Sequence, residues 1–509
     1  MSFRALTFLS TLALAARAAN VTVASLFLGE SVILRAGSGG ARVWGRAAPS
    51  ASVRVALDGA PAGVAVADAS GRWELLLPSQ AASWRVVSLT ADDEAGGSGA
   101  VASVRFGILM ACSGQSNMEL GLGRLDNGTE EVAAAGAYTG RISLLTLLAP
   151  RRTFPPWNGS SEAPQWNAVS PGVNGTVENF SGLCFLTGRA ILEAVDAPVG
   201  LIYGAVGGTP IEAWLPDSVL GHVCPVDTPP CGGAADSALY NELIAPFTPY
   251  SLSLALFDQA ERDVRCFAPA TNRTAQYPCM ENALVSTWRA AFKSDFGFAA
   301  IQLPGYLGDC SEHGGDYFNC VPGVYNMRLA QEAGLVGVPN ASTVVTYDLS
   351  CPFGVDTPQC PLGSVHNLNK TVIAARAARA LLSQMDPSTF PPSGAASPRA
   401  ASVTAAPTGR GYWLVTVTFD VAPVALRGTQ YCTDCCSAGV GDFDASVDGV
   451  VWANSTAAQM MSGGAVVFTV PAPAKPTTVR YTANQPFPQC SVFSPENGLP
   501  AAPFIMTVD

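Results

Sequence analysis

The segment VRFGILMACSGQSNMEL, residues 104–120, determines the fold expected for this chain. Its apolar run is typical of a strand that is buried on both faces of a parallel sheet. The small and polar residues of CSGQSN follow at once, so Ser116 lies just past the carboxyl end of that strand. Open α/β sheets bind their ligands at this edge. We therefore take Ser116 as a candidate nucleophile, with an ordinary loop or helix-capping serine as the alternative.

The chain on either side of this strand divides into regions of different pattern. From 104 to 386, apolar strands such as PVGLIYGAV and FAAIQL alternate with helical stretches, which predicts a parallel sheet with helices on both faces. Residues 20–103 and 398–509 show short alternating strands separated by turn residues, which predicts a β domain at each end. Because 509 residues exceed the usual size of one hydrophobic core, several domains are expected.

Residues 1–19 have the pattern of a secretory signal peptide, in which Arg4 precedes an apolar run that ends in small residues. This run is shorter than the roughly 20 residues that span a bilayer, and no later segment is long and apolar enough to span one. The net charge of −11 argues against nucleic acid or an anionic membrane surface as a partner. We therefore expect a secreted or lysosomal protein.

Cysteine content and glycosylation signals agree with export. Fourteen cysteines fit an oxidising compartment, and YCTDCC at 431–436 favours disulfides over zinc because no histidine lies near it. Close pairs that short disulfides could join are Cys224/Cys231, Cys310/Cys320 and Cys351/Cys360. Nine Asn-X-Ser/Thr sequons predict surface positions at Asn20, Asn127, Asn158, Asn174, Asn179, Asn272, Asn340, Asn369 and Asn454.

A serine hydroxyl needs a neighbouring base to take its proton, and the chain has only three histidines. His222 and His313 lie in cysteine-containing segments that we expect to be surface loops. His366 follows the last expected strand of the sheet and leads into a helix over 370–385. From that position an imidazole can reach the edge that carries Ser116. We therefore expect His366 to be the base, with a surface histidine as the alternative.

An ordered series of segments resembles the sialate O-acetylesterases, a branch of the SGNH hydrolases. The resemblance implies a flavodoxin-like hydrolase domain, here residues 104–386, flanked by β-sandwich-like modules. The double cysteine of YCTDCC also resembles the carboxyl-terminal part of animal members. The matching segments are SLFLGESVILR (25–35), GQSNM (114–118), GLIYGAVGGTPIEAW (200–214), LYNELIAP (239–246), ALVSTWRAAF (283–292), FAAIQLPGY (298–306), CPFGVDTPQCPLGSVHN (351–367) and AAPFI (501–505).

The resemblance carries the family's catalytic serine to Ser116 and its histidine to His366. It implies an oxyanion hole formed by the backbone N–H of Ser116, a glycine of the pair Gly207/Gly208 and the side-chain amide of Gln259. Such donors stabilise the negative charge that develops on a carbonyl oxygen, and the loss of one typically costs ~10²–10³ in turnover.

Two departures from the family pattern affect these expectations. The segment FDQAERD keeps Gln259, but Ala260 stands where the family has glycine. In many SGNH hydrolases an Asp three residues before the histidine orients the imidazole, and that position is Gly363 here. The groups that could orient His366 instead are a backbone carbonyl, Asp348 and Asp356. A structural role at the end of a strand is the alternative for Asp348.

Together with the candidate pair Ser116 and His366, the resemblance implies a carbohydrate O-acetylesterase that works through an acyl-enzyme, with acetylated sialic acid as substrate. No metal and no organic cofactor are expected. One alternative is another carbohydrate acetylesterase, such as an acetylxylan esterase. A second is a non-catalytic glycan-binding homologue, since a fold alone does not establish activity. The presence of both Ser116 and His366 argues against the second alternative.

Overall fold

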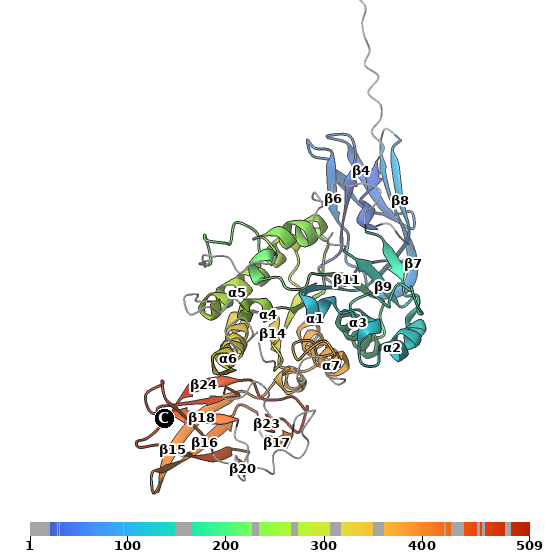
Figure 1. Cartoon of the computed structure of the whole chain (residues 1–509). Coiled ribbons are helices and arrows are strands. Elements are labelled where there is room, and N and C mark those ends of the chain that lie inside the picture. Colours follow the sequence, from blue (N-terminus) through green and yellow to red (C-terminus); the bar gives the residue numbers. More distant parts are fainter. Residues whose placement is uncertain are drawn as a thin grey trace, which may run out of the picture.

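Strands dominate both ends of the chain, and helices gather around a sheet in the middle (Figure 1). The computed structural model describes residues 21–27, 29, 31–94, 96–147, 164–225, 234–265, 273–305, 317–349, 361–421, 424–428, 442–455, 459–460, 464–483 and 490–509. The predicted signal peptide lies outside these ranges. None of the described helices is long and apolar enough to cross a membrane.

The central sheet has parallel strands in the spatial order β9-β11-β8-β12-β13-β14, and β10 adds an antiparallel edge beyond β9. The chain builds one side of β8 with β9 and β11 and then crosses to the other side for β12. Ligands of open α/β sheets bind where the strand order changes in this way. The strands are β8 (Ser98–Gly114), β9 (Ile142–Thr146), β10 (Trp166–Ala168), β11 (Val199–Ala205), β12 (Leu254–Asp258), β13 (Gly297–Ile301) and β14 (Ala341–Val344).

Alternate residues of β8 pack on opposite faces of this sheet. Leu109 and Ala111 belong to the apolar cluster that contains α5 and α6, whereas Met110 and Cys112 belong to the cluster that contains α3 and α7. The expected parallel sheet with helices on both faces is therefore present. The helices are α1 (Ser116–Glu119), α2 (Gly128–Ala134), α3 (Gly182–Val195), α4 (Glu261–Arg265), α5 (Arg273–Phe292), α6 (Tyr317–Leu335) and α7 (Lys370–Met385).

Strand β8 also joins the amino-terminal strands to the central sheet. Its first part pairs with β2 and β7, and its last part pairs with β11 and β12. The expected boundary between 103 and 104 thus falls inside one continuous strand, and the division into domains stays a prediction. The amino-terminal strands are β1 (Thr22–Val23), β2 (Val32–Arg35), β3 (Arg42–Arg46), β4 (Ser52–Leu57), β5 (Ala60–Val66), β6 (Arg72–Leu76) and β7 (Ser83–Asp93).

The carboxyl-terminal strands pack against the α/β part through buried tyrosines. The Tyr347 hydroxyl donates to the carbonyl of Ala501 at 2.8 Å. It also lies 3.1 Å from the hydroxyl of Tyr481. The Tyr325 hydroxyl donates to the carbonyl of Phe504 at 2.7 Å. The strands are β15 (Ala400–Gly409), β16 (Tyr412–Phe419), β17 (Ala425–Gly428), β18 (Phe443–Ser446), β19 (Trp452–Asn454), β20 (Gln459–Met460), β21 (Val466–Pro471), β22 (Thr478–Tyr481), β23 (Cys490–Phe493) and β24 (Phe504–Thr507).

Two disulfides join distant parts of the α/β region. Cys112 of β8 is bonded to Cys184 of α3, and Cys224 is bonded to Cys279 of α5. The expected pair Cys224/Cys231 is therefore wrong, because the fold brings a more distant cysteine to Cys224. The other two expected pairs lie outside the described side chains. Among the described sequons, the exposed asparagines are Asn127, Asn174, Asn179, Asn340 and Asn454, and Asn369 is half-buried.

The disulfide between Cys112 and Cys184 connects residues 72 positions apart. A cross-link of that span removes enough entropy from the unfolded chain to stabilise the fold by about 4 kcal/mol. We predict that Cys112→Ala/Cys184→Ala lowers the free energy of unfolding in urea by about that amount. The matched variant Cys224→Ala/Cys279→Ala opens a span of 55 residues and should cost nearly as much. A loss below about 1 kcal/mol in both variants would contradict this account.

Candidate active site

Ser116 begins α1 directly after β8 and is half-buried at the carboxyl edge of the sheet. The turn before it depends on Gly114, whose φ of +133° favours glycine. A Cβ on Gly114 would lie 2.1 Å from the carbonyl oxygen of Asp258. Because the chain passes so close to the end of β12, the Gln115 N–H donates to that same oxygen at 2.8 Å. Gly114 therefore determines the position of Ser116 relative to the end of β12.

His366 lies against Ser116 although 250 positions separate them, with 2.9 Å between Nε2 and the serine Oγ. Its other ring nitrogen, Nδ1, lies 2.9 Å from the carbonyl oxygen of Leu362. A carbonyl oxygen can only accept a hydrogen bond, so Nδ1 carries the proton and Nε2 can accept the serine proton. Gly363, with φ of +76°, turns the chain so that residue 362 reaches the ring. The predicted pair of side chains is thus within hydrogen-bond distance.

A backbone carbonyl, and not a carboxylate of the described residues, orients the imidazole of His366. Asp348 instead forms a bidentate ion pair with Arg376 of α7, in which both N–O distances are 2.7 Å. Both side chains of this pair are buried. Asp348 was one of the groups that could orient His366, and the structure instead gives it the structural role that was its alternative. Asp356, the other candidate, lies outside the described residues.

Gly207 and Gly208 follow β11 and lie beside the serine. A Cβ on Gly207 would lie 3.2 Å from the Cβ of Ser116. The N–H of Gly207 donates to Oε2 of Glu119 at 2.8 Å. Within the described part of the chain, the N–H groups of Gly208 and Ser116 donate to no protein acceptor. Of the two glycines, Gly208 is the one whose N–H is left for a bound molecule.

Gln259 is buried at the end of β12, and its amide is already hydrogen-bonded. Its Nε2 donates to the Thr209 carbonyl at 2.9 Å and to Oδ2 of Asp263 at 2.5 Å. Its Oε1 accepts from the Tyr277 hydroxyl at 3.0 Å. A carboxamide has two N–H donors, and both are engaged. The oxyanion role expected for Gln259 is therefore not observed, and its amide instead ties the loop after β11 to α4.

Ala260 has a backbone conformation that suits glycine. Its φ is +125° and its side chain is fully buried. Such a conformation costs an ordinary residue about 1–3 kcal/mol. Ala260 therefore holds a backbone conformation that a glycine would adopt without strain.

This strain predicts an unusual response to substitution. A buried alanine changed to glycine normally lowers stability by about 1 kcal/mol. We predict that Ala260→Gly leaves the melting temperature unchanged or raises it, because relief of strain offsets that loss. The control Ala255→Gly, in the buried strand β12 with ordinary φ, should lower it. Equal losses in the two variants would show that Ala260 is unstrained.

The side chain next to the nucleophile, Asn117, is the centre of a buried polar network. Its Nδ2 donates to Oε1 of Glu261 and to the Val365 carbonyl at 2.9 Å, and its Oδ1 accepts from Nζ of Lys370 at 2.7 Å. Burial, with the charge of nearby Glu261, raises the pKa of Asp258 to about 8. Burial also lowers the pKa of Lys370. The amide thus links the nucleophile's helix to the residue beside His366.

The sequence alone gives no role to Asn117, Lys370 or Glu119. Lys370 looks like an exposed lysine at the start of a helix, and nothing in its neighbourhood marks it as buried. Glu119 could have been noticed, since it follows Ser116 by three residues and helical spacing puts both on one face. The third histidine, His222, is exposed as expected. His313 lies outside the described residues, within which no group of three His, Cys, Asp or Glu side chains could hold a metal.

Comparison with known proteins identifies related sequences and a related fold. The sialate O-acetylesterase of Rattus norvegicus is 27% identical over 320 residues, which cover 54% of this chain and 56% of that protein. That of Homo sapiens is 26% identical over 375 residues, 69% of this chain and 68% of that protein. A carbohydrate acetylesterase from Xanthomonas citri has a TM-score of 0.75 at 22% identity, covering 96% of this chain and 99% of that one. No protein-family model matches the chain.

Proposed function

We propose that the chain is a carbohydrate O-acetylesterase that removes O-acetyl groups from sialic acids on glycans, since the relatives that are 26% identical to it are sialate O-acetylesterases. The observation that supports this most directly is the 2.9 Å contact between Ser116 Oγ and His366 Nε2, with the imidazole held by a carbonyl. A disulfide-containing protein of this kind fits the secretory pathway, and we propose a secreted or lysosomal location.

In the proposed reaction, His366 Nε2 takes the proton of Ser116 while Oγ attacks the carbonyl carbon of the acetyl ester. The developing negative oxygen is stabilised by the backbone N–H groups of Ser116 and Gly208. His366 then returns the proton to the sugar oxygen, which leaves as an alcohol. A water molecule, deprotonated by the same imidazole, then attacks the acetyl carbon, and His366 returns the proton to Ser116 Oγ as acetate leaves. Apart from this water, every group that acts on the ester belongs to the protein.

The test is hydrolysis of an acetyl ester by the secreted protein and two variants. Ser116→Ala and His366→Ala should each lower turnover of 4-nitrophenyl acetate by about 10⁴ or more, because each removes one partner of the proton transfer. The control His222→Ala, an exposed histidine, should keep full activity. Circular dichroism of all three variants checks folding. Unchanged turnover in Ser116→Ala would refute the nucleophile, and turnover of acetylated xylan above that of acetylated sialic acid would refute the substrate.

The orientation of His366 by Leu362 predicts that Asp348 is not a member of a catalytic triad. We expect Asp348→Asn to lower turnover less than about 10²-fold, whereas loss of a true triad Asp costs about 10⁴. Its main effect should be on stability, since it leaves the buried guanidinium of Arg376 without a charge partner. The same limit on turnover is predicted for Asp356→Asn. A collapse of turnover in either variant, with the fold intact, would reveal a triad.

A further inference from the structure

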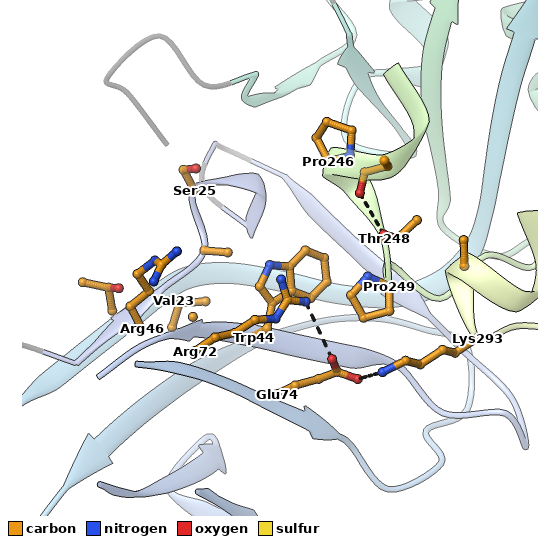
Figure 2. Close-up of a pocket in the computed structure, with 15 residues that line it drawn as sticks. Val23, Ser25, Trp44, Arg46, Arg72, Glu74, Pro246, Thr248, Pro249 and Lys293 are labelled. Carbon is orange, nitrogen blue, oxygen red and sulfur yellow. Dashed lines mark hydrogen bonds and ion pairs between the residues drawn. The ribbon is translucent and has the colours of Figure 1, made fainter. Parts of the chain in front are cut away.

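A cavity with a volume of about 940 Å³ lies away from Ser116, between the amino-terminal strands and the α/β part. We call it the basic pocket. Figure 2 shows its walls: Arg46, Arg72 and Glu74 come from β3 and β6, and Lys293 approaches from the end of α5. Segments about 200 residues apart thus build one cavity. None of its lining residues belongs to the candidate active site.

The charges that line the basic pocket are unbalanced. Among the described residues that line it, three cations, Arg46, Arg72 and Lys293, face one carboxylate, Glu74. Oε1 of Glu74 already accepts from Lys293 at 2.8 Å and from Arg42 at 3.1 Å. Burial disfavours the charge of Glu74, but Lys293, Arg42 and Arg72 outweigh it and lower its pKa. A positive site on a chain of net charge −11 attracts anionic ligands selectively.

The cations are held in place by the surrounding structure. The guanidinium of Arg72 lies over the ring of Trp44, 5.7 Å from its centroid. Trp44 is itself fixed by edge-on contacts with Phe27 and Tyr250. The guanidinium of Arg46 donates to the Ser70 carbonyl at 3.0 Å. Side chains that are already restrained lose little conformational entropy when a ligand binds. The basic pocket is therefore preorganised for binding.

The chemistry of the basic pocket indicates a polyhydroxylated anion. Guanidinium groups recognise carboxylates and sulfates, and Arg72 and Lys293 keep 40% and 50% of their side-chain surface exposed to meet one. The second oxygen of Glu74, Oε2, lies 3.6 Å from the guanidinium of Arg72, which is longer than a hydrogen bond. This oxygen can therefore accept a hydrogen bond from a hydroxyl group of a ligand. A polyphosphate offers no such donor, whereas a sugar offers several. The volume lies at the upper end of the range for small-molecule sites, which suits an oligosaccharide.

We propose that the basic pocket is a second, non-catalytic site that binds an acidic oligosaccharide through Arg46, Arg72 and Lys293. The choice of a glycan rests on the proposed function, while the choice of an anion rests on the pocket alone. Such a site anchors an acidic glycan while another part of it is deacetylated at Ser116, which raises the effective concentration of substrate.

The test measures binding of sialyllactose, lactose 3′-sulfate and neutral lactose by titration calorimetry. The wild-type chain should bind an acidic sugar more tightly than lactose, and Arg46→Gln/Arg72→Gln should weaken that binding by about tenfold or more. The control Arg54→Gln/Arg85→Gln removes the same charge from exposed ion pairs of two other amino-terminal strands, β4 and β7, and should change little. Tighter binding of sialyllactose identifies a carboxylate as the anion, and tighter binding of the sulfated sugar identifies a sulfate.

Turnover of 4-nitrophenyl acetate separates this proposal from the proposed function. That small neutral ester should be hydrolysed equally by the wild type, Arg46→Gln/Arg72→Gln and the control variant. An inactive wild type that still binds acidic sugars through these arginines would refute the esterase and leave the second site standing. Equal affinity for lactose and both acidic sugars, or full affinity in Arg46→Gln/Arg72→Gln with an unchanged melting temperature, would overturn the second site.

Discussion

The contact between the Asn117 side chain and the Val365 carbonyl holds the candidate active site together. Asn117 belongs to the helix that begins with Ser116, and Val365 immediately precedes His366. One amide therefore sets the distance between α1 and the segment that carries His366, which lie about 250 residues apart in the chain. A proton moves between serine and imidazole only when the two atoms stay within about 3 Å, so the positions of α1 and of that segment are a condition for the reaction.

The side-chain amide of Asn117 is held by two buried charged groups. Either charge, buried without a partner, would destabilise the fold. Lys370 and Glu261 are both buried, and Asn117 lies between them as acceptor of one and donor to the other. Buried ions are tolerated when each finds a partner, and hydrogen bonds between buried polar groups make the structure around them more rigid. Lys370 is also the first residue of α7, so the same contact anchors the helix that covers one face of the sheet. Folding of the sheet and assembly of the site are thereby coupled.

Much of the architecture was predictable because apolar strands and turn residues carry strong local signals. The parallel sheet, the position of Ser116 after β8 and its pairing with His366 follow from such signals and from the small number of histidines. The domain boundary expected at 103/104 falls inside β8, and periodicity cannot show that one strand serves two sheets. The sandwich arrangement of the terminal strands stays a prediction.

The sequence by itself determined which residues are nucleophile and base candidates, because strand ends and residue types are local properties of the chain. It did not determine what orients His366, what Gln259 binds or which cysteine meets Cys224, since each depends on partners far away in the sequence. Only the tertiary structure decided that Leu362 holds the imidazole and that Gln259 donates to Asp263. Hydrogen bonds are short and directional, so a displacement of about 1 Å changes a partner while leaving the fold and its sequence pattern intact.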